Sequence, residues 1–112
     1  MYKAEKDFTE RKLESQTMLN RFNERIPIIV ERRRNNIVPI DKRKFMAPES
    51  LTMGQFTFVI RKRLKLQPSE AVFLFINNKL INQSRCLKEE YDTNKDEDGF
   101  LYVYYDFENA FG

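Results

Sequence analysis

Few side chains in this sequence of 112 residues have the types that catalysis needs. The chain has one cysteine, Cys86, and no histidine, so the thiol lacks the base that most often activates a cysteine nucleophile. One cysteine also cannot form an internal disulfide, which fits a reducing compartment. The sequence contains no phosphate-binding glycine motif. We therefore expect that the chain is not an enzyme, and we predict no cofactor.

One acidic segment has the spacing of a metal-binding loop. Asn94-x-Asp96-x-Asp98-Gly99 imitates the first half of a calcium-binding EF-hand. The twelfth position of such a loop needs a bidentate glutamate, but it is Tyr105 here, and a strand is predicted there instead of a helix. We therefore predict a solvated acidic turn and no metal site.

Basic residues form three clusters in the chain. Lysine and arginine number 20 against 17 acidic residues, and cations gather at 32–34, 42–44 and 61–63. Such clusters attract acidic partners, but they come with no nucleic-acid-binding motif and no interleaved aromatic residues for base stacking. We expect no nucleic-acid partner. The cluster at 61–63 is predicted to face water, and Lys42 and Lys44 are predicted to attract an acidic peptide.

The clearest helix signal begins at Thr52. Thr52 and Gln55 have the spacing of a capping box, in which each side chain accepts a hydrogen bond from a backbone N–H at the helix start. Apolar side chains then recur at steps of three and four residues, namely Met53, Phe56, Val59, Ile60 and Leu64. This stripe predicts a helix that packs on a sheet.

Three strands are predicted at 26–30, 71–76 and 100–105. Each is apolar throughout, which indicates that both faces of their sheet are covered. A fourth strand, 42–47, alternates cationic and apolar residues and precedes Pro48, which cannot donate a ladder hydrogen bond. We therefore place this strand at a sheet edge that is open to another chain.

The N-terminal segment is predicted to cover the second face of the sheet. Asp7 or Thr9 can cap a helix there. Its docking residues are expected to be apolar: Phe8, Met18, Leu19 and Phe22. Further along the chain, Asn77-Asn78 predicts a turn, Leu80 and Ile81 a minor strand, and Ser84 the cap of a short helix that carries Leu87 and Tyr91.

The order of these elements predicts an α+β fold, a ubiquitin-like β-grasp with an added N-terminal helical segment. We divide this single domain into a helical arm (1–25), the β-grasp core (26–106) and a conjugation tail (107–112). No apolar run is long enough to cross a bilayer, so we expect a soluble, cytosolic chain. On a ubiquitin-like body we predict that Gly112 is the reacting residue, whose terminal carboxyl passes as a thioester between enzyme cysteines and ends as an amide. A carboxyl without a neighbouring Cβ enters narrow enzyme clefts easily.

Five stretches carry a resemblance to a known family: ERIPIIVE, DKRKFMAPESLTMGQFTFVIRKR, AVFLFINN, DGFLYV and the final FG. In these the chain resembles the ubiquitin-like autophagy modifiers, the family of the gamma-aminobutyrate-receptor-associated protein. The resemblance implies that an ATP-dependent enzyme activates Gly112, that a conjugating enzyme receives it, and that it is joined to phosphatidylethanolamine. It also implies a cytoplasmic monomer, held reversibly on autophagosomal membranes and released by a cysteine protease.

The family also binds receptors and adaptors through short motifs. Each motif consists of an aromatic residue, any two residues and then an aliphatic residue (aromatic-x-x-aliphatic). An extended peptide can pair with an edge strand at 44–46, and pockets then give selectivity. By resemblance, the aromatic pocket comprises Glu14, Met18, Pro27, Ile29, Lys44, Met46 and Phe100. The aliphatic pocket comprises Phe45, Ala47, Pro48, Leu51, Phe56 and Val59, and the acidic flank meets Arg25, Lys42, Lys44 and Arg63.

The sequence departs from the family pattern at several positions. Phe45 stands where the family commonly has tyrosine, and Ala47 where it has a larger aliphatic residue, which predicts a roomier second pocket. Many family members carry an extension after the terminal glycine, which a cysteine protease removes, but no residue follows Gly112 here. We therefore expect either that the gene encodes this terminus directly or that the sequence is the form left after removal of an extension. Two other readings stay open: an interaction module that binds acidic peptides or the cytoskeleton without conjugation, and conjugation to a protein lysine instead of lipid.

Overall fold

The computed structural model describes residues 1–108. Gly112, the predicted conjugation residue, therefore lies outside the described residues. The elements, in chain order, are α1 (Tyr2–Glu5), α2 (Phe8–Arg21), β1 (Arg25–Arg32), β2 (Lys44–Pro48), α3 (Met53–Arg63), β3 (Phe73–Ile76), β4 (Lys79–Leu80), α4 (Leu87–Asn94) and β5 (Leu101–Asp106). Among the helices of these residues, none is both long enough and apolar enough to span a membrane.

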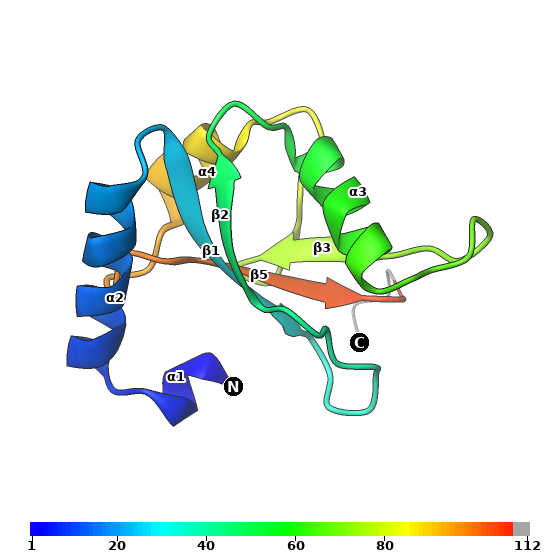
Figure 1. Ribbon diagram of the computed structural model, residues 1–112. Helices are drawn as coiled ribbons and strands as arrows, with labels where there is room; N and C mark the ends of the chain where they lie inside the picture. The colour runs from blue at the N-terminus through cyan, green and yellow to red at the C-terminus, as the bar shows by residue number, and fades with distance from the viewer. Residues whose placement is uncertain (109–112) are drawn as a thin grey trace.

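The five strands form one mixed sheet in the order β2-β1-β5-β3-β4. The two central strands, β1 and β5, run parallel, and the other neighbouring pairs run antiparallel. This arrangement confirms the predicted ubiquitin-like β-grasp, and it confirms that β2 lies at an edge of the sheet (Figure 1).

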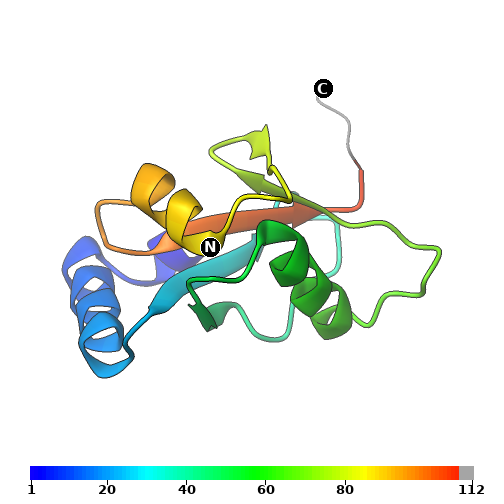
Figure 2. The ribbon, with the colours of Figure 1, turned by 90° about the horizontal axis from the view of Figure 1, so that it is seen from above.

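Helices cover both faces of the sheet, as the apolar strands predicted. Figures 1 and 2 show α2 and α3 on opposite sides of it. On the face that we call the α3 face, side chains from alternate strand positions meet α3 and α4 in one apolar cluster. On the other, the arm face, a smaller cluster contains Tyr2, Ile29, Phe100 and Tyr102, with Met18 packed against it.

Helix α3 begins with the predicted capping box. Thr52 Oγ1 accepts from the Gln55 N–H, and Gln55 Oε1 accepts from the Thr52 N–H. Met53, Phe56 and Ile60 of the predicted stripe are buried in the core. Val59 is 37 % exposed, so the prediction that it packs on the sheet with the rest of the stripe was wrong. It lies at the edge of the stripe, where the helix surface turns away from the sheet.

The arm is attached in part as predicted, because Met18 packs against the arm-face cluster, but its buried residues on α2 are not the predicted ones. Asp7 caps α2 by accepting the Glu10 N–H at 2.9 Å, which confirms one of the two expected caps. Phe8 and Phe22, however, are 45 % and 41 % exposed. The buried positions of α2 are Arg11 and Ser15, which lie four residues apart on one helix face. A search for apolar docking residues missed them because both are polar.

A second correction concerns α4. Cys86, not Ser84, is its N-cap residue, and the Cys86 N–H donates to the Glu89 carboxylate at 3.1 Å. Ser84 instead belongs to the preceding turn, where its N–H and hydroxyl both donate to Asn82 Oδ1. Asn77 and Asn78 do form the predicted turn between β3 and β4, both with positive φ.

Candidate peptide-binding site

The outer edge of β2 presents backbone groups that another strand can pair with. At the start of the β1–β2 ladder the Val30 N–H donates to the Arg43 carbonyl at 2.7 Å. Hydrogen-bonded and non-hydrogen-bonded pairs alternate along an antiparallel ladder. The next residue, Lys44, and then Met46 therefore direct their N–H and C=O groups away from β1, toward the open edge. Pro48, which has no N–H, is the last residue of the strand.

The side chains of β2 alternate between the two faces of the sheet. Phe45 and Ala47 enter the core on the α3 face. Lys44 and Met46, at the intervening positions, project toward the arm. An extended peptide paired with β2 alternates in the same way, so two of its side chains that are three residues apart point to opposite faces. The edge thus suits an aromatic-x-x-aliphatic motif whose two anchors enter different hollows.

The hollow on the arm side lies between α2 and β2. It is lined by Lys6, Glu10, Leu13, Glu14, Thr17, Met18 and Lys44. The structure therefore brings together Glu14, Met18 and Lys44, three of the residues predicted for the aromatic pocket. Four lining residues were missed, because which side of α2 borders β2 depends on how the helix docks.

Glu14 is the electrostatic centre of this hollow. Its carboxylate accepts hydrogen bonds from the Tyr2 hydroxyl and the Lys44 ammonium group, and Lys6 Nζ lies at 3.4 Å. Lys44 is thereby held over the rim of the hollow, beside the open backbone of β2. A peptide carboxylate that binds here would compete with Glu14 for Lys44.

The other residues predicted for the aromatic pocket lie deeper. Ile29 and Phe100 are 0 % exposed and belong to the arm-face core. Pro27 is buried, and Met46 is half-buried on β2. In this conformation Ile29 and Phe100 support the hollow as part of the core.

On the α3 side, Val59 is exposed and Leu51 is half-buried against the core. Pro48 is also exposed, but it continues the alternation of Lys44 and Met46 along β2 and therefore lies on the arm side. Phe45 and Phe56 are buried and meet edge to face, with ring centroids 5.7 Å apart. Of the set predicted for the aliphatic pocket, Leu51 and Val59 are therefore the residues on this side that a ligand can reach first.

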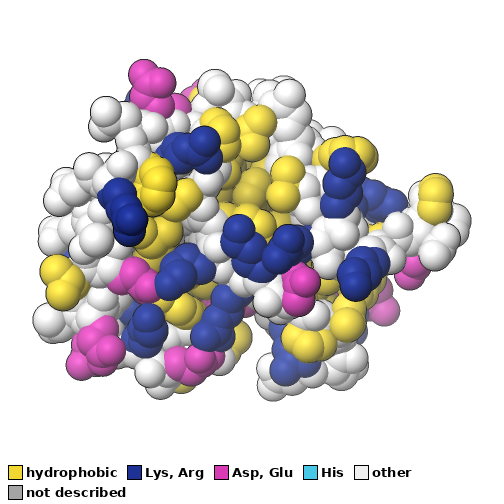
Figure 3. Space-filling model, viewed as in Figure 1, with side chains coloured by type: hydrophobic (Ala, Val, Ile, Leu, Met, Phe, Trp, Pro, Cys, Tyr) yellow, Lys and Arg dark blue, Asp and Glu magenta, His cyan; other side chains and the backbone are white. Residues whose placement is uncertain are grey.

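The predicted cations border the same edge. Figure 3 shows lysine and arginine side chains gathered over the middle of the molecule, where β2 runs in Figure 1. Arg25 Nη1 donates to the outward carbonyl of Met46 at 3.1 Å, and Lys42 Nζ lies 4.9 Å from the Phe45 ring centroid. Arg63 Nε donates to Asp41 at 3.1 Å. An acidic peptide would find positive charge on both sides of the strand.

A buried ion pair fixes the arm that forms one wall of the site. Arg11 Nη1 donates to Asp98 Oδ2 at 2.6 Å, and Asp98 is 0 % exposed. The Tyr102 hydroxyl donates to the same oxygen at 2.5 Å. The prediction of a solvated acidic turn was therefore wrong for Asp98. In residues 1–108 the structure has no cluster of three acidic or sulfur ligands for a metal.

The turn after Asp98 depends on glycine. Gly99 has a φ of 91°, and a Cβ built there would lie 2.3 Å from Ser15 Oγ. Ser15 Oγ also donates to the Asp98 carbonyl at 2.5 Å. The small side chain of Ser15 and the missing side chain of Gly99 together let α2 approach this turn closely.

Two carboxylates at the edge of the arm have pKa values shifted in opposite directions. Hydrogen bonds from Arg43 lower the pKa of Glu5 to about 2. Burial raises the pKa of Glu31, whose carboxylate accepts the Tyr2 N–H at 2.7 Å. Burial, together with the hydrogen bond to Asp98, raises the pKa of Tyr102. The arm face is therefore held by charged and polar groups that the sequence patterns did not indicate.

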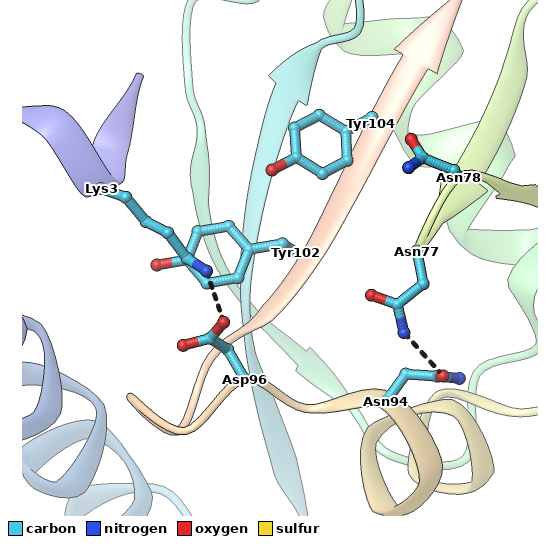
Figure 4. Close-up of a pocket in the computed structure, with 7 residues that line it drawn as sticks. All are labelled: Lys3, Asn77, Asn78, Asn94, Asp96, Tyr102 and Tyr104. Atoms are coloured by element: carbon cyan, nitrogen blue, oxygen red, sulfur yellow. Dashed lines mark hydrogen bonds and ion pairs between the residues drawn. The ribbon is translucent and has the colours of Figure 1, made fainter.

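A separate polar hollow lies on the arm face, away from β2 (Figure 4). Lys3, Asn77, Asn78, Asn94, Asp96, Tyr102 and Tyr104 line it. Lys3 forms an ion pair with Asp96, and Asn77 Nδ2 donates to Asn94 Oδ1 at 3.0 Å, so these polar groups already pair with one another. In the sheet, β1 lies between the β2 edge and β5, whose Tyr102 and Tyr104 line this hollow. It is not part of the candidate peptide site.

Comparison with known proteins gives a consistent result. A family model described as "Autophagy protein Atg8 ubiquitin like" matches residues 10–112. Autophagy-related protein 8 of Saccharomyces cerevisiae (strain YJM789) is 46 % identical, covering 99 % of this chain and 96 % of the relative. Autophagy-related protein 8e of Arabidopsis thaliana is 44 % identical, covering 100 % and 93 %.

Solved structures agree with these sequence matches. The crystal structure of Trypanosoma brucei ATG8 has a TM-score of 0.91 and 38 % identity, covering 99 % of this chain and 97 % of the other. Plasmodium falciparum Atg8, solved in complex with a Plasmodium falciparum Atg3 peptide, has a TM-score of 0.89 and 29 % identity, covering 99 % and 98 %.

Proposed function

Since this chain belongs to the Atg8 family of ubiquitin-like autophagy proteins, we propose that it is a modifier and is itself the substrate of a conjugation reaction. Its terminal carboxyl at Gly112 is activated with ATP and passes as a thioester between enzyme cysteines. The amine of phosphatidylethanolamine then displaces the thiol and forms an amide. Intact mass after reconstitution with these enzymes tests the step, and Gly112→Ala is its control.

Attachment of this lipid changes where the chain resides. Each buried methylene contributes about 0.8 kcal/mol, so two acyl chains hold the protein firmly on a bilayer. Cleavage of the amide by a cysteine protease returns it to the cytoplasm. In this proposal the helical arm (1–25) and the core (26–106) form the recognition body, and residues 107–112 are the conjugation tail.

The second part of the proposal is that the β2 edge binds receptors and adaptors through aromatic-x-x-aliphatic motifs. One observation carries it: β2 has an open, outward-facing edge whose side chains alternate between two sides, with the arm-side hollow on one and the surface at Leu51 and Val59 on the other. Anchors three residues apart fit this geometry. Contacts of this size commonly give micromolar affinity, about −8 kcal/mol.

The same edge is a candidate site for the conjugating enzyme. The Plasmodium relative was solved with an Atg3 peptide. We infer that this chain also binds an extended segment of its own conjugating enzyme. If both partners use the β2 edge, a receptor peptide will slow transfer of the chain to lipid.

Peptide titration tests the recognition proposal. We expect a peptide with an acidic flank and a tryptophan-x-x-leucine core to bind at least tenfold more tightly than one with a tryptophan-x-leucine core. The shorter spacing sends both anchors to the same face. Equal affinity for the two spacings would contradict the proposal.

A matched pair of charge reversals locates the site. Lys44→Glu places an anion beside Glu14 and should weaken binding of the acidic peptide at least tenfold. Lys79→Glu reverses an exposed lysine on β4, the opposite edge strand, and should change the affinity less than twofold. Equal effects of the two substitutions would show nonspecific charge attraction.

The alternative of an unconjugated interaction module makes a different prediction. Gly112→Ala should then have no consequence in cells, although peptide binding at β2 is retained. Under the modifier proposal the same variant keeps peptide binding but loses its membrane location.

A further inference from the structure

An exposed aromatic residue on α3 has basic and apolar neighbours. Phe58, Arg61, Lys62, Lys65, Leu66 and Pro68 surround an open hollow at the end of α3, and we call this set the α3-end patch. Phe58 is 57 % exposed, and Lys62 Nζ lies 4.8 Å from its ring centroid. The patch is not part of the peptide site at β2.

The charge around the patch is strongly positive. Residues 61–72 contain four cations and one acidic residue, Glu70, which gives a net charge of +3. Lys62 and Lys65 are both exposed. A surface that combines exposed apolar side chains with clustered lysines is complementary to the anionic headgroups and apolar interior of a bilayer.

The loop of the patch is held in place before any ligand binds. Arg61 Nη1 donates to the Glu70 carbonyl at 2.6 Å, and Nη2 donates to the Gln67 carbonyl at 3.1 Å. The Gln67 N–H donates in turn to the Glu70 carboxylate at 2.8 Å. Leu66 and Pro68 are thus presented by an ordered loop, which reduces the entropy lost on binding.

The patch lies at the end of the molecule from which the chain leaves its last strand. Figures 1 and 2 both place the loop between α3 and β3 at the same end as the last residues of β5. Leu66 and Phe107 also pack on the same α3-face core. Gly112 is six residues after Asp106 in the chain, and six residues span at most about 20 Å.

We propose that the α3-end patch contacts the anionic phospholipid surface to which the chain is attached. This inference rests on the proposed lipid attachment, which brings that end of the molecule to the bilayer. Phe58 and Pro68 enter the boundary between headgroups and acyl chains, and Lys62 and Lys65 lie against lipid phosphates. Each of these lysines contributes about fivefold to the partition. The contact orients the body on the membrane.

The test uses a tether in place of the lipid bond. The full chain carries a C-terminal hexahistidine tag and is bound to vesicles that contain a nickel-chelating lipid, with either neutral phosphatidylcholine or added phosphatidylserine. An environment-sensitive fluorophore is attached at Gln67→Cys in a Cys86→Ser background. A second labelled protein carries the fluorophore at Asn20→Cys on α2, at the other end of the molecule. Co-sedimentation confirms that each protein is tethered.

On phosphatidylserine vesicles we expect emission at position 67 to rise at least twofold and shift to shorter wavelength, with no change at position 20. Phe58→Ser should at least halve the rise, and Lys62→Gln with Lys65→Gln should abolish its dependence on phosphatidylserine. Phe22→Ser is the matched control, because Phe22 is also an exposed phenylalanine beside a cation, Arg21. It should leave the signal unchanged.

Three results would overturn the inference: no rise at position 67 on tethered anionic vesicles, an equal rise at position 20, or a rise that Phe58→Ser reduces by less than half. Thermal unfolding of each variant verifies that it is folded. Because the tether bypasses Gly112, failure of lipid conjugation leaves this result unaffected. A chain that conjugates normally but shows no rise refutes only the α3-end contact.

Discussion

The two faces of the sheet are stabilised in different ways. In residues 1–108 the α3 face buries a cluster of sixteen apolar residues, whereas the arm-face cluster has four. The arm is attached largely through polar groups: the Arg11–Asp98 ion pair, the Ser15 hydrogen bond and the Glu5–Arg43 pair. Apolar packing makes the first face the stable part of the domain. Polar contacts make the second face sensitive to single substitutions and to pH.

The largest expected effect is on the α3 face. Phe56→Ala removes a buried ring that contacts Phe45, and should destabilise the protein by about 3–5 kcal/mol. Because this core joins α3 and the strands, we expect amide exchange to accelerate throughout the sheet, in denaturant-free solution. Acceleration confined to α3 would show that the helix and the sheet do not unfold together.

Loss of the buried ion pair should act on the arm. Arg11→Met leaves the Asp98 carboxylate buried without its cation, at a cost of about 3 kcal/mol. We expect amide exchange in α1 and α2 to rise about 100-fold, with much smaller changes in α3. Phe8→Ser, on the same helix but at an exposed position, should cost less than about 0.5 kcal/mol. Equal exchange increases on both faces after Arg11→Met would contradict the comparison.

The smallest effect concerns pH. Because the pKa of Glu31 is raised from 4.5, the folded protein binds more protons than the unfolded chain between pH 4.5 and that raised value. Stability from this group therefore falls as pH rises through that interval. Glu31→Gln, whose amide oxygen can still accept the Tyr2 N–H, should remove this fall. Denaturant unfolding from pH 4 to 7 measures it.

Glu5 is the opposite case within the same arm. Its pKa is lowered from 4.5 to about 2, so its contribution is present above pH 4.5 and is lost as pH falls toward 2. Glu5→Gln should therefore reduce the dependence of stability on pH below 4.5 and leave the interval above it unchanged. If Glu5→Gln instead weakened the pH dependence of stability above pH 4.5, the lowered pKa would not belong to Glu5.

The same contrast explains what could be predicted from the sequence. The α3 face follows from local patterns: the Thr52–Gln55 capping box, the stripe through Phe56 and Ile60, and the apolar strands. Pro48 correctly indicated the edge strand. These signals come from residues close together in the chain, which a single sequence displays directly.

The arm face could not be predicted in the same way. Arg11 and Asp98 lie 87 residues apart. Each is of a charged type that is usually exposed, and only their pairing in the folded protein explains why both are buried. Their pairing depends on how α2 docks, as does the position of Leu13 beside the arm-side hollow. The resemblance to a family supplied Glu14 and Lys44, which local patterns alone did not distinguish from surface residues, whereas Met18 was also expected from the apolar residues of the N-terminal helix.

The most direct test of the proposed function is reconstitution of conjugation. The purified chain is incubated with the family's activating and conjugating enzymes, ATP and phosphatidylethanolamine vesicles, and its intact mass is recorded beside Gly112→Ala. We predict that the unmodified sequence alone gains the mass of one lipid less one water. No gain with an enzyme set that conjugates a known relative in the same vesicles would contradict the modifier proposal.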